Sequence, residues 1–143
     1  MAVNVLRDVT EQRRAEEERA RFAAIVESSN DAIIGKTLDG MITSWNEAAE
    51  RIYGYSAEEA IGQPISMLVP SDRPDEVPAI LDSVRQGEKV EPFDTVRVTK
   101  DGRRLDISLT VSPIRNFAGD VVGASTIARD TPGVSALRRR FAS

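Results

Sequence analysis

Two Asp-Gly dipeptides constrain the fold of this chain more than any other feature of its sequence. Asp39-Gly40 and Asp101-Gly102 each stand between two stretches in which apolar and polar residues alternate. An Asp-Gly pair in this setting is a strong signal for a β-hairpin. The strands are expected at residues 31–37 and 41–45 in the first hairpin and at 93–100 and 103–114 in the second, with a further strand at 121–129.

A two-residue turn at Asp101-Gly102 would fix the register of the second hairpin. It places Val98 opposite Leu105 and Val96 opposite Ile107. Cross-strand partners point to the same face of a sheet. One apolar face is therefore expected from Val96, Val98, Leu105, Ile107, Leu109 and Val111.

Short helices are expected between the two hairpins. Asn46 is placed to cap a helix over 47–53, and Ser56 begins a capping box for a second helix. A longer helix is expected over 74–86, and a charged, Ala-rich one over 11–28. Because parallel β-α-β alternation is absent, the predicted class is α+β: a five-stranded antiparallel sheet packed on helices.

The composition excludes several kinds of chemistry. The 143 residues are enough for one domain, and they include neither Cys nor His. Disulfides, thiolate metal sites, covalent thiol-linked chromophores and histidine catalysis are therefore excluded. The net charge of −4 disfavours binding to nucleic acid. No apolar run is long enough for a membrane span and no secretory signal is visible, so no membrane insertion and a cytoplasmic location are expected.

A series of short motifs follows in order over about residues 22–131. They are Asp31-Ala32-Ile33-Ile34, Thr43-Ser44-Trp45-Asn46, Tyr53-Gly54-Tyr55-Ser56, Lys100-Asp101-Gly102, Ser112-Pro113-Ile114 and Ala128-Arg129-Asp130. With this order and spacing the chain resembles the PAS (Per-Arnt-Sim) sensor family. The resemblance implies a PAS-like five-stranded antiparallel sheet flanked by short helices, with an extended N-terminal helix.

The resemblance also implies a domain plan. Residues 1–10 look like a linker or the end of a preceding PAS repeat, because Asp8 and Thr10 repeat the pattern of Asp130 and Thr131. Residues 11–28 would be a connecting and dimerisation helix, 29–131 the PAS domain, and 132–143 a C-terminal linker or tail. Asp8, Thr10 and Asp130 would then lie where a signal passes between domains.

Members of the family bind small ligands between the sheet and the helix that corresponds to 74–86. The pocket residues expected from this resemblance are Ile34, Leu81, Val84, Val96, Leu109, Val111, Ala124 and Thr126. No metal and no cofactor are expected. Haem in particular is not, because the place of the family's haem-binding histidine falls near Glu76 and a carboxylate is a poor haem ligand. A non-covalently bound flavin and a small apolar ligand both stay open.

The function expected from the resemblance is a sensory or regulatory module without catalysis of its own. It would bind a small ligand or a partner domain and relay a conformational signal within a signalling protein, such as a sensor histidine kinase of a two-component system. The alternatives are a non-covalent flavin-binding redox sensor and a ligand-free dimerisation module. The expected partners are neighbouring signalling domains of the parent chain.

A homodimer is also expected. Alternation along 121–129 places Ile127 on the sheet face away from the short helices, together with Ile33 and Trp45. The apolar stripe of the N-terminal helix is narrow, so a second chain is needed to cover this face. The predicted interface consists of Phe22, Ile25, Val26 and Ile127.

Overall fold

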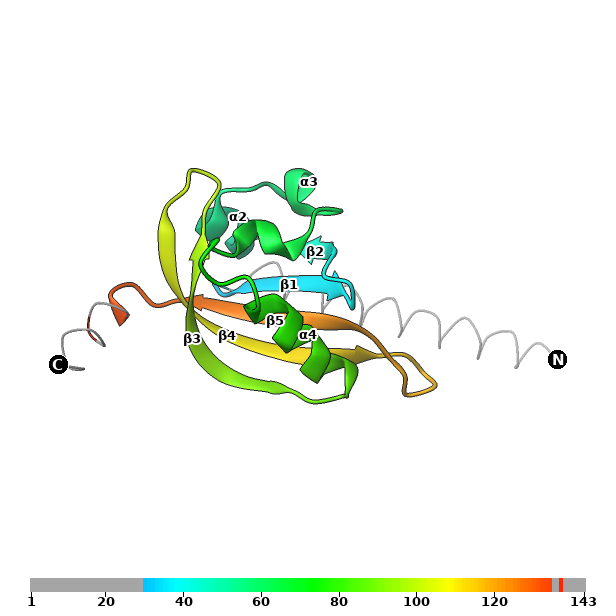
Figure 1. Cartoon of the computed structure of the whole chain (residues 1–143). Coiled ribbons are helices and arrows are strands. Elements are labelled where there is room, and N and C mark those ends of the chain that lie inside the picture. The colour runs from blue at the N-terminus through cyan, green and yellow to red at the C-terminus, as the bar shows by residue number, and fades with distance from the viewer. Residues whose placement is uncertain (1–29, 135–136, 138–143) are drawn as a thin grey trace.

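The first and the last strand of the domain lie side by side in the middle of one antiparallel sheet (Figure 1). The computed structural model describes residues 30–134 and 137. The sheet has the order β2-β1-β5-β4-β3. Its strands are β1 (Ala32–Thr37), β2 (Ile42–Trp45), β3 (Val90–Val98), β4 (Arg104–Arg115) and β5 (Val121–Asp130).

The helices connect the two hairpins, so the α+β class predicted from the sequence is confirmed. They are α2 (Glu47–Tyr53), α3 (Ala57–Ala60), the 3-10 helix η1 (Ile65–Leu68) and α4 (Glu76–Arg85). The Asn46 side chain caps α2 by accepting a hydrogen bond from the Ala49 N–H, and Ser56 and Glu59 form the predicted capping box of α3. Local capping residues therefore set the start of both helices.

The predicted register of the second hairpin is wrong by one residue. Its loop has three residues, not two, because the Thr99 N–H donates to the Arg103 carbonyl at 2.9 Å and Gly102 takes a left-handed conformation with φ of 86°. A glycine in this conformation closes a three-residue hairpin loop with a bulge. Val98 thus lies opposite Arg104, and Val96 lies opposite Asp106.

This register decides which side chains of β3 face the helices. Phe93, Thr95 and Arg97 share the inner face with Leu109 and Ile107, whereas Val96 and Val98 belong to the outer face. The apolar face predicted for the hairpin is therefore correct along β4 and wrong along β3.

The main core lies between the inner face of the sheet and the helices. The predicted alternation of β5 is confirmed from Gly123 onward, since Ala124 and Ala128 are fully buried while Ile127 is 43% exposed. It is wrong at Val121, which packs against the inner cluster because the register of the β4–β5 pairing shifts between Val121 and Gly123. Ile33 is the cross-strand partner of Ile127 and shares the outer face, as predicted. Trp45 does not: it pairs with Ile34, lies in the core, and contacts the Tyr53 ring with centroids 5.6 Å apart. Its outer-face assignment was wrong because β2 pairs with β1 in the register that turns Trp45 inward.

Candidate functional site

The predicted pocket residues come together on one side of the sheet, with one exception. Ile34, Leu81 and Leu109 belong to the main core cluster, and Val84, Val111 and Ala124 form a smaller cluster with Ile80. Thr126 lies on the same inner face, opposite Val111. Val96 is the exception, and its predicted place in the pocket is wrong: the three-residue loop turns it to the outer face.

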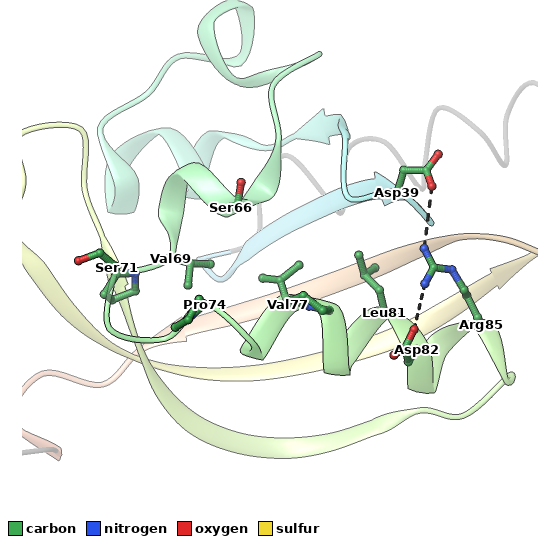
Figure 2. A pocket seen from close by; sticks show the side chains of 11 residues that line it. Asp39, Ser66, Val69, Ser71, Pro74, Val77, Leu81, Asp82 and Arg85 are labelled. Carbon is green, nitrogen blue, oxygen red and sulfur yellow. Dashed lines mark hydrogen bonds and ion pairs between the residues drawn. The ribbon is translucent and has the colours of Figure 1, made fainter.

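These residues form a packed interior, and a groove lies next to it (Figure 2). The groove has a volume of about 490 Å³ and runs between η1, the segment 69–71 and α4. Its middle is apolar and is formed by Val69, Val77, Leu81, Pro70, Pro74 and Pro78. Of the predicted pocket residues, Leu81 lines this groove. The groove forms because η1 and α4 lie beside each other, which the sequence alone does not determine. The prolines around the start of α4 are the only sequence feature that pointed to this region.

The Arg85 side chain closes one end of the groove. Its guanidinium donates to the Leu38 carbonyl at 2.7 Å and to the Asp82 carboxylate at 3.0 Å, and it lies 3.9 Å from Asp39 (Figure 2). Arg85 thereby ties the last turn of α4 to the loop between β1 and β2. Ser66 and Ser71 supply hydroxyl groups elsewhere along the groove.

The first turn of α4 is tied to β3 by a buried ion pair. The Glu76 carboxylate lies 2.7 Å from the Arg97 guanidinium and accepts hydrogen bonds from the Thr95 hydroxyl at 2.7 and 2.9 Å. Burial alone raises the pKa of Glu76, but the hydrogen bond from Thr95 and the charge of Arg97 outweigh this effect, so the pKa lies below its usual value. Glu76 is therefore ionised. It anchors the first turn of α4 to β3, while Arg85 anchors the last turn to the loop between β1 and β2.

Two further buried groups titrate abnormally. Burial, and then the charge of Arg97, lowers the pKa of Lys36 to about 8. Burial raises the pKa of Tyr53 to about 12. Each shift favours the neutral form of its group, as expected where water is excluded.

The residues predicted for the dimer interface and for signal relay are only partly within the described part of the chain. Phe22, Ile25, Val26, Asp8 and Thr10 lie outside the described residues. Ile127 borders a shallow hollow on the outer face of the sheet, with Ser108, Thr110 and Arg129 around it. Asp130 is exposed at the end of β5, and the next residue, Thr131, donates its N–H to the Asp106 carbonyl.

The part of the chain that the structure describes contains neither a candidate metal site nor a candidate membrane-spanning helix. No three His, Cys, Asp or Glu residues among residues 30–134 and 137 are grouped so that they could hold a metal ion. No helix formed by these residues is long and apolar enough to cross a membrane.

Comparison with known proteins identifies the family. The model of the PAS fold matches residues 20–131. The signal transduction histidine-protein kinase AtoS of Escherichia coli is 33% identical over 118 residues, which are 82% of this chain and 19% of the kinase. Two-component system protein A of Emericella nidulans is 37% identical over 93 residues, which are 64% of this chain and 13% of that protein.

Solved structures agree with the sequence relatives. A PAS domain from Colwellia psychrerythraea is 36% identical and superposes with a TM-score of 0.71, covering 78% of this chain and 95% of that one. An RNA-binding light-oxygen-voltage receptor, 24% identical, has a TM-score of 0.74 over 85% of this chain and 34% of its own, and shows similarity of fold alone. The chain thus spans a small part of its curated relatives, and it belongs to the PAS family of sensory domains found in signalling proteins such as histidine kinases.

Proposed function

We propose that the domain senses a small, largely apolar molecule that binds in the groove between η1 and α4. The domain would work within a longer signalling protein, of which a sensor histidine kinase is the favoured kind. The observation that carries the proposal is the groove itself: it holds about 490 Å³, its middle is apolar, and it lies directly beside the core. Ligand sites of proteins typically combine an apolar lining with a few polar groups at defined places.

The two anchors of α4 supply a route from the groove to the sheet. Val77 and Leu81 line the groove and also belong to the core cluster. A molecule that separates α4 from η1 would therefore press on the core and pull on both anchors. Glu76 would pass this movement to β3, and Arg85 would pass it to the loop that follows β1. Since β1 pairs with β5, the movement would reach the strand that ends at Asp130.

A substitution that fills the groove tests this function. Ser66 is exposed and lines the groove, so Ser66→Trp is expected to occupy it without disturbing the core. The neutral fluorescent probe N-phenyl-1-naphthylamine is expected to bind the unmodified chain with saturation, and about tenfold or more weaker to Ser66→Trp, a loss of about 1.4 kcal/mol. The matched control is Ala79→Trp, on the exposed side of α4.

The outcome of this titration separates the proposed function from its alternatives. Undiminished binding to Ser66→Trp would place the probe elsewhere and contradict the proposal. The absorption spectrum of the purified chain is the companion measurement: flavin bands would favour the flavin-binding redox sensor. A chain that binds no probe and no flavin would favour the ligand-free dimerisation module.

A second prediction concerns the outer face of the sheet. If this face covers the same face of a second chain, Ile127→Asp places a carboxylate in an apolar interface, and the dimer is expected to dissociate about tenfold or more readily. The matched control is Phe117→Asp, because Phe117 is an exposed apolar residue of the loop between β4 and β5 and therefore lies off the face of the sheet. Sedimentation velocity measures the result. A monomer at high micromolar concentration of the unmodified chain would contradict the predicted dimer.

A further inference from the structure

One aromatic side chain differs from the rest of the described residues in its exposure. Phe117, in the loop between β4 and β5, is fully exposed, with 112% of the reference accessible surface. The other exposed large apolar side chains among residues 30–134 and 137 are 38–52% exposed, so each of them is covered in part. In Figure 1 the loop of Phe117 projects past the end of α4. No described part of the chain covers this ring, and another molecule can.

The loop that carries Phe117 is held in place by hydrogen bonds. The Asn116 N–H donates to the Asp120 carbonyl, and the Asn116 side-chain oxygen accepts from the Asp120 N–H, both at 3.0 Å. The Arg115 guanidinium donates to a carbonyl of the loop at 2.8 Å and to the Gly87 carbonyl, just after α4, at 3.4 Å. An aromatic side chain that is already in position loses little conformational freedom on binding, which favours it as an anchor of an interface.

The groove between η1 and α4 has the properties that such a ring needs in a partner. It has a volume of about 490 Å³, and its middle is formed by apolar side chains that include Val69, Val77 and Leu81. Ser66, on the wall opposite α4, is exposed, so the groove is accessible from solvent. Aromatic anchors of interfaces typically enter apolar pockets of this kind.

The charges beside the loop and beside the groove are complementary. Arg115 and Asp120 flank the loop, and Asp39, Asp82 and Arg85 lie at one end of the groove. The Asp39 side chain is 92% exposed, and its ion pair with Arg85 is as long as 3.9 Å, so its carboxylate is available to a further cation. In a complex Arg115 can face the two carboxylates while Asp120 faces Arg85. Opposite charges of this kind favour one orientation of two partners.

We propose that Phe117 of one copy of the domain inserts into the groove between η1 and α4 of a second copy. Both halves of the contact are present in one chain, and this makes a second copy the partner that fits. The contact is heterologous, since it joins the loop of one copy to the groove of the other. A phenylalanine buries roughly 150–250 Å², below the 800 Å² or so that each partner buries in a stable complex. The contact is therefore weak unless neighbouring domains hold the copies together.

The inference rests on the groove of the proposed function and adds a form of regulation to it. Phe117 and a small apolar molecule compete for the same space, so binding of the molecule releases the loop of the second copy. The contact is separate from the predicted pairing of the outer faces, because Phe117 lies in a loop and off the face of the sheet.

Complementation between two variants tests this contact. Both variants carry Ile127→Asp, which removes the predicted pairing of the outer faces. In this background Phe117→Ser keeps the groove and lacks the ring, whereas Ser66→Trp keeps the ring and fills the groove. Sedimentation equilibrium at high micromolar concentration measures the association. Each variant alone is expected to associate about tenfold or more weakly than the background chain, and their equimolar mixture is expected to form a 1:1 complex with about the background affinity.

Two matched controls and one competitor complete the experiment. Ile61→Ser removes an exposed apolar side chain after α3, and Ala79→Trp adds an indole on the exposed side of α4. Both controls are expected to associate as the background chain does. A saturating concentration of N-phenyl-1-naphthylamine is expected to weaken the association of the background chain about tenfold or more, because the probe occupies the groove.

The outcomes separate this inference from the proposed function. A monomeric background chain, undiminished association of Phe117→Ser or Ser66→Trp, or a mixture that forms no complex refutes the contact, and binding of the probe then still supports the sensing of a small molecule. A probe that binds in the groove without weakening the association also refutes the contact. If the mixture forms the complex and the chain binds no probe, the contact is supported and the proposed function fails.

Discussion

Replacing Glu76 by alanine is expected to destabilise the domain by about 3–5 kcal/mol, because it leaves a buried charge without its partner. The Arg97 side chain is 5% exposed, and the Glu76 carboxylate 2.7 Å away is its counter-ion. The substitution also removes the acceptor of both Thr95 hydrogen bonds. Urea unfolding followed by circular dichroism measures the change in the free energy of unfolding.

A double substitution tests whether the unpaired charge of Arg97 causes the loss of stability in Glu76→Ala. Arg97→Met removes the cation together with its need for a partner, so Glu76→Ala combined with Arg97→Met is expected to recover most of the lost stability. The control is Glu47→Ala at the exposed pair with Arg51, where a loss below about 1 kcal/mol is expected. A loss below about 1 kcal/mol at Glu76 as well would show that the buried pair does not anchor α4.

Replacing Lys36 by methionine is expected to stabilise the domain strongly, in contrast to the loss of stability expected for Glu76→Ala. The pKa of Lys36 is lowered from 10.5 to about 8, so folding disfavours its charged form. One pKa unit corresponds to about 1.4 kcal/mol, and the charge therefore lowers stability at pH 7 by about 3 kcal/mol. Lys36→Met is expected to be more stable than the unmodified chain by about 2–3 kcal/mol at pH 7, measured by urea unfolding.

The stability difference between Lys36→Met and the unmodified chain is expected to depend on pH in a way that identifies Lys36 as its cause. Between about pH 8 and pH 10.5 the unfolded chain holds a proton on Lys36 that the folded chain has released, so the unmodified protein gains stability as the pH rises. Lys36→Met lacks this gain, and the two stabilities converge toward pH 10.5. Tyr53, whose pKa is raised to about 12, lowers the stability of both proteins above about pH 10 and cancels in the comparison. A difference that stays constant from pH 7 to pH 10 would refute the assignment.

The sequence was most informative where structure is decided by a few neighbouring residues. The limits of α2 and the start of α3 are set by single residues. Asn46 and Ser56 begin the two helices by accepting hydrogen bonds from backbone N–H groups, and Gly54 ends α2 in the left-handed conformation that glycine adopts readily. The alternation of β5 was predictable for the same reason, since a strand turns successive side chains to opposite faces. The identity of the fold followed from such local signals in the right order.

The errors arise where distant segments determine the result. Asp101-Gly102 marks a hairpin in either register, and only the position of Gly102 in a three-residue loop turns Arg97 inward and Val96 outward. Charged residues such as Lys36 and Arg97 normally indicate the solvent face of a strand, so their burial could not be predicted without the helix that covers them. The groove was missed likewise, because it exists only once η1 and α4 are placed beside each other.

The pairing of β1 with β5 has a consequence for how such a domain is used in a longer chain. Ala32, at the start of β1, is the cross-strand partner of Ala128 near the end of β5, and an ion pair between Asp31 and Arg129 joins the same ends. Paired residues lie about 5 Å apart at their Cα atoms. A domain whose two ends meet can be spliced into a protein, or duplicated in tandem, without changing the spacing of what stands on either side. Insertion of the domain by gene fusion therefore requires little change in the geometry of the neighbouring domains. Because the start of β1 and the end of β5 are close together, a twist of these central strands would move the segment that enters the domain and the segment that leaves it at the same time.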